Sequence, residues 1–386
     1  MIIRLRGYSS LLEAEEEWKR FGLGKVAESA DDLFGSRFFF AEGREQQEIA
    51  DLAFAAEDRG GDAWRCDSLG VFRAMLAFEP EVLQPINCDA TGADPLSVIR
   101  RVQALYNRTE APELRWKGGK LGFDSTRIMG VLNVTPDSFS DGGRHLRRED
   151  AVRRGLEMAE QGADIIDVGG ESTRPNARPV STKVEKERIM PVIEDLASEI
   201  TIPISVDTRH PGVAEAALGA GASIINDVGG LREPGMIEVV VRTGAPIIMM
   251  HMQGGPTSMQ RDPQYFDVVG DICLFFEEGM KQAMAQGLER ERVMLDPGLG
   301  FGKTVQHNLD IIRRLREFSC LERPLMIGAS RKGFIGKLLG TDEDQRLEGS
   351  LAAAAAAIMN GASIVRAHDV RETKRVARVV DALKRK

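Results

Sequence analysis

Short apolar runs alternate with longer segments of helical character from Arg127 to the C-terminus. This alternation is typical of parallel βαβ units. The eight predicted strands are Ile128–Asn133, Asp164–Val168, Ile202–Asp207, Ser223–Asp227, Pro246–Met250, Arg292–Leu295, Pro324–Gly328 and Ser363–Arg366. Helices are expected after them, for example at Glu149–Gln161 and Gly349–Met359. Eight units of this total length predict an α/β fold, a (β/α)8 TIM barrel, with a doubly wound open sheet as the alternative.

Three of these units share a junction in which a glycine ends the helix and an apolar strand follows. The junctions begin at Gly162, Gly221 and Gly361, and each glycine is followed by alanine, a polar residue and two β-branched residues. Such repetition favours a closed barrel of similar units. Any loop that joins a helix to a strand can use the same residues, however, so the open sheet is not excluded.

The residues before about 120 have a different pattern. We expect a short strand at Met1–Arg6, an acidic helix near Ser10–Phe21, an apolar run at Ser36–Phe40 and helices at Gln46–Ala56 and Leu96–Asn107. All three tryptophans precede residue 120, whereas all five histidines follow residue 144. The polar, glycine-containing stretch Glu113–Thr126 is the expected junction. The sequence thus predicts a smaller N-terminal α+β domain of unknown role (1–120) and a barrel domain (121–386).

Composition and charge exclude several classes of protein. The content of 42% hydrophobic and 28% charged residues is ordinary for a globular chain, and no apolar run approaches membrane-spanning length. The first residues lack the layout of a cleavable signal, so we expect a cytoplasmic protein without a membrane partner. The net charge of −8 is spread along the chain, which argues against nucleic-acid binding. The four cysteines show neither zinc-type spacing nor a disulfide framework.

Polar side chains occur where each predicted strand ends. They are Asn133, Asp167 with Glu171, Asp207, Asn226 with Asp227, His251, Asp296, the run Ser330 to Lys332, and Arg366 with His368. Catalytic groups of these barrels lie at the C-terminal ends of the strands. A single Asp or Asn there can simply cap a helix or a turn, but capping does not explain eight consecutive polar strand ends. Lys332 and Arg366, after the last two strands, indicate a phosphate site.

Two loops and four polar residues indicate which chemical groups a ligand at the strand ends would have. The loops 133–143 and 169–175 are rich in Gly, Ser, Thr and Pro, and the backbone N–H groups of residues other than proline and the Ser and Thr hydroxyls can contact an anion. Asp207, Asn226, Asp296 and Lys332 are expected to converge from four strands. This set suits a nitrogen heterocycle, because a carboxylate accepts two parallel hydrogen bonds from an amino-pyrimidinone edge. Alternatively, Asp207 and Asp296 are helix N-caps.

Eight motifs in a fixed order carry a family resemblance over residues 127–386. They are Gly130–Gly143, Asp167–Pro175, Ser205–Thr208, Ile225–Val228, Met250–Gly254, Asp296–Lys303, Ser330–Lys332 and Arg366–Val370. In these motifs the barrel resembles the dihydropteroate synthases of folate biosynthesis. The resemblance implies a transferase that joins 6-hydroxymethyl-7,8-dihydropterin pyrophosphate to p-aminobenzoate and releases pyrophosphate, assisted by Mg²⁺. It also implies a homodimer formed through barrel helices.

The resemblance further implies roles for individual residues. The pterin would be held by Asp207, Asn226, Met250, Asp296, Phe301, Gly328 and Lys332. The pyrophosphate would be held by Asn133, Arg366 and His368, with Asn133 also binding the metal. The p-aminobenzoate site would contain Phe139, Thr173, Arg174, Pro175 and Ser330. The predicted catalytic group is Lys332, Arg366, His368 and Asp207.

Our hypothesis for the mechanism is that the leaving group departs ahead of attack by the arylamine, because the dihydropterin can delocalise a cation. Two other functions are considered. One is a pterin-binding methyltransferase-type barrel, and the other is a non-catalytic pterin-binding protein with an N-terminal interaction module. The methyltransferase-type barrel does not need a pyrophosphate site, so the two loops, Ser330–Lys332 and Arg366–His368 favour the synthase over it. We interpret His251 as a buried, hydrogen-bonded residue and the other histidines, His368 apart, as structural or surface residues.

Overall fold

A computed structural model describes residues 2–6, 37–43, 46–58, 62–68, 71–78, 111–116, 118–135, 144–171, 180–255, 259 and 261–384. The chain divides into two compact units, residues 1–109 with 316–322 and residues 110–315 with 323–386. The helices expected near Ser10–Phe21 and Leu96–Asn107 lie outside the described residues. None of the helices described has both the length and the apolar character needed to cross a membrane.

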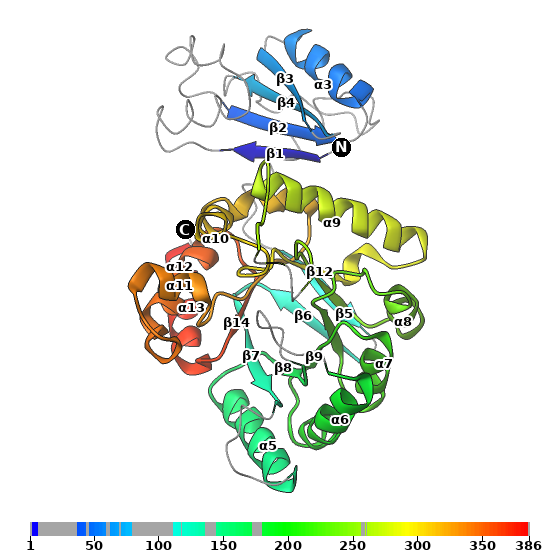
Figure 1. The fold of residues 1–386 in the computed structure, drawn as a ribbon, viewed down its shortest axis with the longest axis vertical. Coiled ribbons are helices and arrows are strands. Elements are labelled where there is room, and N and C mark those ends of the chain that lie inside the picture. The colour runs from blue at the N-terminus through cyan, green and yellow to red at the C-terminus, as the bar shows by residue number, and fades with distance from the viewer. Residues whose placement is uncertain are drawn as a thin grey trace. The chain divides into compact units, whose positions relative to one another are not determined.

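The described part of the N-terminal unit is a sheet with one helix. Its elements are β1 (Ile2–Arg6), β2 (Arg37–Gly43), α3 (Gln46–Asp58), β3 (Asp62–Ser68) and β4 (Val71–Phe78). The antiparallel strand order is β1-β2-β4-β3, and Figure 1 shows α3 beside β3 and β4. Fully buried Phe39, Leu52 and Leu76 join the helix and the sheet in one core. The expected α+β character is confirmed.

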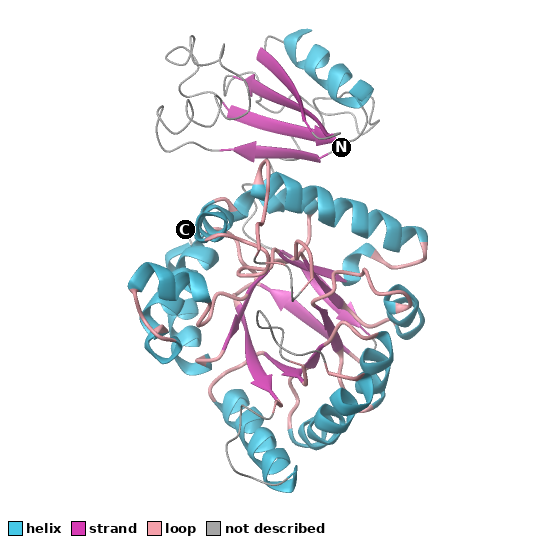
Figure 2. Ribbon diagram, in the orientation of Figure 1, coloured by secondary structure: helices cyan, strands magenta, loops and turns pink. Residues whose placement is uncertain are grey.

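The second unit contains eight parallel strands with helices between them. Its strands are β7 (Arg127–Asn133), β8 (Ile165–Gly169), β9 (Ile204–Asp207), β10 (Ile224–Asp227), β11 (Ile247–Met250), β12 (Val293–Asp296), β13 (Met326–Ile327) and β14 (Ile364–Ala367). Its helices are α5 (Arg144–Glu160), α6 (Thr182–Glu199), α7 (Pro211–Gly219), α8 (Met236–Thr243), α9 (Val268–Ala285), α10 (Val305–Arg313), α11 (Gly333–Leu339), α12 (Leu347–Met359) and α13 (Val370–Lys384). Figure 2 shows these helices surrounding the strands.

The eight strands form a closed ring. Strands β7 to β12 are neighbours in chain order, and β14 pairs with both β7 and β13. A parallel bridge between Leu295 and Leu325 closes the remaining gap. The barrel prediction is therefore confirmed, and each predicted strand lies within two residues of the observed one at both ends. Gly162, Gly221 and Gly361 have φ of 96°, 115° and 106°, so these glycines do provide the left-handed turn after the helices.

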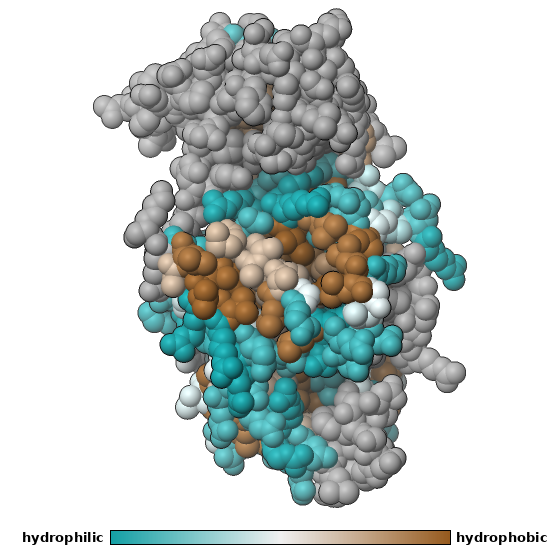
Figure 3. Space-filling view, turned by 90° about the vertical axis from the view of Figure 1, so that its left-hand side faces the viewer, coloured by the Kyte–Doolittle hydropathy of each residue, from teal (hydrophilic) through white to brown (hydrophobic). Residues whose placement is uncertain are grey.

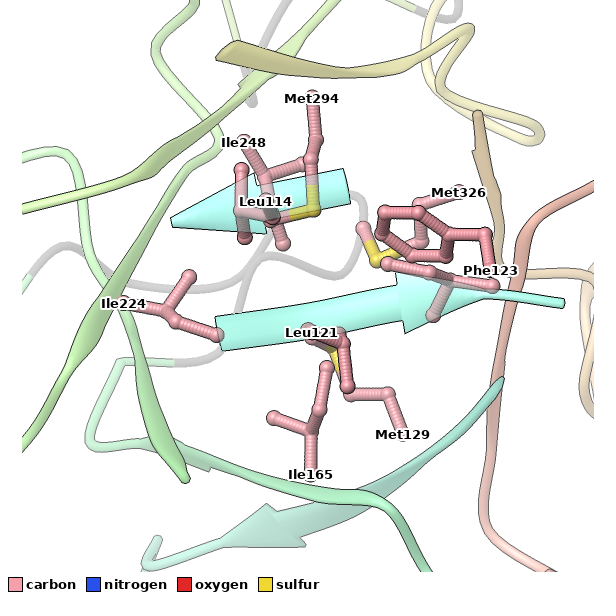
Figure 4. Packing of buried hydrophobic residues seen from close by; sticks show 10 residues of the cluster. Leu114, Leu121, Phe123, Met129, Ile165, Ile224, Ile248, Met294 and Met326 are labelled. Carbon is pink, nitrogen blue, oxygen red and sulfur yellow. The ribbon is translucent and has the colours of Figure 1, made fainter. Parts of the chain in front are cut away.

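A two-stranded hairpin fills the N-terminal end of the barrel. It consists of β5 (Ala111–Trp116) and β6 (Gly119–Phe123), and so occupies most of the expected junction. Its inward residues Leu114, Leu121 and Phe123 join a cluster with Met129, Ile165, Ile224, Ile248, Met294, Met326 and Ile364 (Figure 4). These partners lie in the first half of their strands. The opposite, C-terminal ends of the strands are thus left for polar residues.

The hairpin should contribute measurably to stability. Leu114 is fully buried in the cluster, so Leu114→Ala is expected to lower the free energy of unfolding by roughly 2–5 kcal/mol through lost burial and the cavity that remains. The matched control Met284→Ala, at a residue on α9 (Val268–Ala285) that is 45% exposed, should change it by less than about 0.5 kcal/mol. Urea denaturation followed by circular dichroism measures both values. Equal effects of the two variants would show that the hairpin is not part of the barrel core.

Candidate active site

The barrel topology brings the predicted pterin residues to one end of the ring. Asp207, Met250 and Asp296 are the last residues of β9, β11 and β12, and Asn226 is the penultimate residue of β10. All four side chains are buried. Since parallel strands point their carboxyl ends in one direction, side chains from four separated segments share one opening.

An ion-pair network anchored by Arg366 crosses this opening. From β14, Arg366 Nε donates to Asp167 Oδ2 at 2.6 Å and Nη2 donates to Asp207 Oδ2 at 2.7 Å. Asn226 Nδ2 donates to the same Asp167 oxygen at 3.0 Å. Asp167 is 0% exposed, and its hydrogen bonds in the network come from these two donors, Arg366 and Asn226. The sequence placed Asp167 among the polar strand ends but did not predict an individual role for it.

Burial and the charge of the ion-pair partner shift the pKa values of Asp207 and Arg366 in opposite directions. Burial raises the pKa of Asp207 to about 7, the Arg366 charge opposes the rise, and the Asp167 charge adds to it. Burial would lower the pKa of Arg366, but the carboxylates of Asp167 and Asp207 outweigh burial and raise it. Arg366 therefore stays charged, and the pKa of Asp207 remains above its usual range despite the ion pair.

Lys332 and Asp296 add a second pair of opposite charges beside this network. Burial raises the pKa of Asp296, while the N–H of Gly298, which donates to Asp296 Oδ1 at 2.8 Å, and the charge of Lys332 oppose the rise. Lys332 Nζ lies 3.9 Å from the centroid of the Phe301 ring, within cation–π distance. Phe301 in turn packs on the apolar cluster that contains Met250. The predicted pterin residues thus combine acids, a cation and an apolar wall.

Ser330 and His368 are joined beside β13 and β14. The backbone N–H of His368 donates to Ser330 Oγ at 3.2 Å, and this oxygen lies 3.0 Å from His368 Nδ1. The Ser330 oxygen has a second lone pair, so this contact fits either tautomer of the neutral imidazole; we assign the hydroxyl proton to Nδ1 and the imidazole proton to Nε2, which leaves Nε2–H for a ligand. Burial lowers the pKa of His368 to about 3. This histidine can therefore donate a hydrogen bond at pH 7 but carries no charge.

Backbone geometry fixes the turn that carries Ser330 and Lys332. Arg331 has φ of 57°, unusual for a residue other than glycine, and its guanidinium pairs with Asp369 at 2.6 Å. The Arg331 backbone N–H donates to Ser350 Oγ at 2.9 Å. Gly328, a predicted pterin residue, lies beside Arg366, because a Cβ at this glycine would be in ordinary contact with Arg366 Cβ at 3.8 Å. These contacts hold the cation and the hydroxyl in position before any ligand binds.

The comparisons with known proteins agree with this geometry. Residues 129–368 match the family described as pterin binding enzyme. The dihydropteroate synthase of Escherichia coli K12 is 47% identical over 266 residues, which are 69% of this chain and 94% of that protein. The chain belongs to the dihydropteroate synthase family. Our prediction of a dihydropteroate synthase, a transferase of folate biosynthesis, is thereby confirmed.

Solved dihydropteroate synthases share the barrel. The Xanthomonas albilineans dihydropteroate synthase with 4-aminobenzoic acid is 42% identical with a TM-score of 0.68, covering 72% of this chain and 99% of that one. The same enzyme with 7,8-dihydropteroate is 40% identical with a TM-score of 0.65, covering 71% of this chain and 100% of that one. Both crystal structures contain small molecules of the expected reaction.

The remaining dihydropteroate synthase positions have different outcomes. Asn133 is the last residue of β7, half-buried and paired in register with Gly169. Phe139, Thr173, Arg174 and Pro175 lie outside the described residues, so their predicted roles stay predictions.

His251 is buried, and its Nδ1 lies 3.0 Å from Lys303 Nζ, as the hydrogen-bonded interpretation requires. Burial lowers the pKa of Lys303 to about 7. Lys303 also donates to the carbonyl of Phe301 at 3.0 Å and thereby anchors the loop after β12. We predicted no role for Lys303, although it ends the Asp296–Lys303 motif.

Proposed function

We propose that the strand-end site condenses 6-hydroxymethyl-7,8-dihydropterin pyrophosphate with p-aminobenzoate to give 7,8-dihydropteroate and pyrophosphate. The observation that carries this proposal is a set of acceptors without donors. Asp167 Oδ1, Asp207 Oδ1 and Asn226 Oδ1 are buried, and none has a hydrogen-bond partner among the described residues. A buried acceptor left unpaired costs about 1–3 kcal/mol, so the site is prepared for a flat ligand with several N–H donors.

The pterin fits this set by chemistry. Its amino-pyrimidinone edge presents N–H groups in a row, which Asp207, Asn226 and Asp296 can accept. Its two faces are apolar and meet Met250 and Phe301, whose cluster borders the acids. Lys332 lies on the Phe301 ring and can donate to an acceptor of the heterocycle. The family match to pterin-binding enzymes supports the same assignment.

The pyrophosphate is proposed to lie against Arg366 and His368. Two of the five guanidinium N–H groups bind Asp167 and Asp207, and the guanidinium has further N–H groups to offer an anion. His368 Nε2–H is a neutral donor, as its Nδ1 faces Ser330. Charge-assisted donors aimed at a developing anion are the strongest contacts for this purpose.

The residues at the end of β7 fit a magnesium ion. Mg²⁺ takes oxygen ligands and is usually held by one or two protein groups together with substrate phosphates. The amide of Asn133 provides such an oxygen at a strand end, so we propose that Asn133 holds Mg²⁺. When bound, Mg²⁺ neutralises charge on the pyrophosphate.

The proposed reaction depends on leaving-group departure. Arg366 and His368 stabilise negative charge on the pyrophosphate as its bond to the pterin methylene breaks. Asp207, Asp296 and Lys332 keep the ring in orientation while it carries the resulting cation. The arylamine is neutral near pH 7 and needs positioning more than deprotonation, which we assign to Ser330 and to the predicted contacts Phe139, Thr173, Arg174 and Pro175.

The test is an assay with the purified chain, pterin pyrophosphate, p-aminobenzoate and Mg²⁺. The synthase releases pyrophosphate in equal amount to the 7,8-dihydropteroate formed, and only when both substrates are present. A methyltransferase-type barrel or a non-catalytic binding protein would bind the pterin and release no pyrophosphate. Pterin binding without pyrophosphate release under these conditions therefore refutes the proposal.

We further propose a homodimer formed through α11, α12 and α13. Figure 3 shows apolar side chains gathered on the face of the barrel that carries these helices. The exposed large residues there are Leu338 and Leu339 on α11, Met359 on α12, and Val379 and Leu383 on α13. Monomeric proteins rarely expose an extensive contiguous apolar surface, so a second copy is the proposed cover.

A charge placed in this face should separate the copies. Val379 is 61% exposed, and Val379→Asp would bury a carboxylate at the interface without a partner. We expect a dimer for the parent chain and a monomer for the variant in light scattering after size exclusion. Val241→Asp, on α8 outside this face, is the matched control and should stay dimeric. If the Val379→Asp protein elutes as a dimer, the interface does not lie on the face formed by α11, α12 and α13.

A cytoplasmic location is also proposed. Four cysteines without the spacing of a disulfide framework are typical of a reducing compartment. Folate biosynthesis, the process in which the family acts, uses small phosphorylated intermediates that do not cross membranes unaided.

A further inference from the structure

Two carboxylates and an imidazole meet outside the pterin network. Glu171 follows β8, Glu185 lies in the first turn of α6, and His210 is the N-cap of α7. One ligand atom of each lies within 4.8 Å of the other two, in the part of the chain that the structure describes. His210 Nε2 lies 3.7 Å from Glu171 Oε2 and 3.9 Å from Glu185 Oε2. We call these three residues the Glu–Glu–His cluster.

Glu185 is the unusual member of this cluster. Its side chain is 0% exposed, and among the described residues neither of its oxygens accepts a hydrogen bond of normal geometry. His210 Nε2 is buried and unpaired in the same sense. Burial raises the pKa of Glu185 to about 7, although the nearby Thr208 hydroxyl acts against the rise. Buried polar groups are almost always paired, so two Glu185 oxygens without a hydrogen bond of normal geometry, close to an unpaired His210 Nε2, indicate a missing ligand.

Local packing brings Glu185 to this point. A Cβ at Gly170 would lie 3.1 Å from Glu185 Cγ, so glycine lets α6 approach the end of β8. The backbone N–H of Val180 donates to Glu171 Oε1 at 3.1 Å, which holds this carboxylate and leaves Oε2 facing His210. The three side chains are therefore positioned by separate elements.

Among the residues that the structure describes, the cations nearby do not fill the cluster. Arg209 Nε lies 3.4 Å from Glu171 Oε2, and its Nη1 lies 3.8 Å from Glu233. Arg188 donates to the carbonyl of Gly170 at 2.7 Å. Both guanidinium groups partly offset the negative charge. A bound ion would share Glu171 with Arg209 and would still be the direct partner of Glu185.

We propose that Glu171, Glu185 and His210 form a binding site for one divalent transition-metal ion, with Zn²⁺ as the favoured ion. One imidazole with two carboxylates suits Zn²⁺, whereas Mg²⁺ and Ca²⁺ prefer oxygen ligands only. Ligand bonds of about 2.0–2.2 Å at a tetrahedral ion separate the ligand atoms by roughly 3.3–3.6 Å. The His210 distances of 3.7 and 3.9 Å require a closing movement of a few tenths of an ångström, and the two carboxylates, whose ligand atoms lie within 4.8 Å of each other, require at most about 1.5 Å. The ion would tie the starts of α6 and α7 to the end of β8.

The experiment uses the full chain, treated with chelator, desalted and free of substrates. Isothermal titration with Zn²⁺ should give one binding event per chain, together with a rise in melting temperature. Glu185→Gln and His210→Gln should each weaken Zn²⁺ binding at least tenfold. The matched control is Glu215→Gln on α7, whose exposed carboxylate pairs with Arg242 at 2.8 Å, and it should bind Zn²⁺ as the parent does.

The outcomes separate cleanly. No Zn²⁺ binding by the parent, or parent-like binding by both cluster variants, overturns the site and leaves an adventitious ion only. His210 is partly exposed, so its variant remains informative if Glu185→Gln does not fold. The titration needs neither pterin nor p-aminobenzoate. Its failure would therefore leave the proposed reaction untouched, and failure of the reaction would leave the ion site untouched.

Discussion

Arg366→Ala is expected to lower kcat for pyrophosphate release by about 10²–10³-fold, with a much smaller change in the Kd of the pterin. The guanidinium contacts Asp167 and Asp207 in the resting site and has further N–H groups for the departing pyrophosphate. Its largest contribution should come when negative charge grows on that group. Steady-state kinetics with both substrates, together with pterin titration, measures the two effects separately.

Loss of Arg366 also leaves two buried carboxylates without their cation, which can cost roughly 3–5 kcal/mol of stability. Arg366→Lys keeps a charge and is the variant to use if the alanine protein unfolds. Exposed Arg371 on α13 supplies the matched control, and Arg371→Ala should leave kcat unchanged. An unchanged kcat in Arg366→Ala, with only weaker pterin binding, would contradict the role in leaving-group departure.

Asp296→Asn should act mainly on pterin binding. The carboxylate accepts from Gly298 through Oδ1, and its other oxygen can accept from the pterin. An amide would present an N–H group where the ligand also has donors, so at least one buried donor would lose its partner. At about 1–3 kcal/mol for such a group, the KM for pterin pyrophosphate should rise by roughly 5–150-fold.

The control for this variant is Asp344→Asn, an exposed aspartate before α12. It should show the KM of the parent chain. Because the substitution conserves shape, kcat of Asp296→Asn should fall far less than kcat/KM. A variant with the parent KM and a kcat reduced by the full factor would assign Asp296 to the chemical step instead of to ring binding.

The strand ends could be predicted because parallel topology turns chain order into spatial convergence. Asp207, Asn226 and Asp296 are separated by up to 89 residues, yet each ends a buried strand of the same ring. The period of apolar runs locates those strands, and closure of the barrel brings their C-terminal ends together. For this reason the convergence of these three residues could be predicted from the sequence, although the hydrogen bonds between the side chains could not.

Other features depend on contacts that periodicity cannot show. The hairpin of β5 and β6 contains an irregular register between Ala111 and Leu114, which interrupts the alternation that identifies a strand. Strand β3 reads DAWRCDS, too polar to be identified without its partner β4. Asp167 differs from its neighbours only through the side chains of Arg366 and Asn226, which reach it from other strands.

The protonation state of His368 could not be predicted from the sequence either. His368 has the residue type expected at a phosphate site, but burial lowers its pKa to about 3 and Ser330 orients its ring. The contribution that we propose for His368 at the pyrophosphate is thus a directed hydrogen bond and not a charge. Only the surroundings of a titratable group, which the fold creates, determine such a state.

The most direct measurement of the central claim is a crystal structure of the chain with pterin pyrophosphate bound. The account predicts the amino-pyrimidinone edge against Asp207, Asn226 and Asp296, and the pyrophosphate against Arg366 and His368. A pterin bound away from the strand ends, or a pyrophosphate directed away from Arg366, would contradict it.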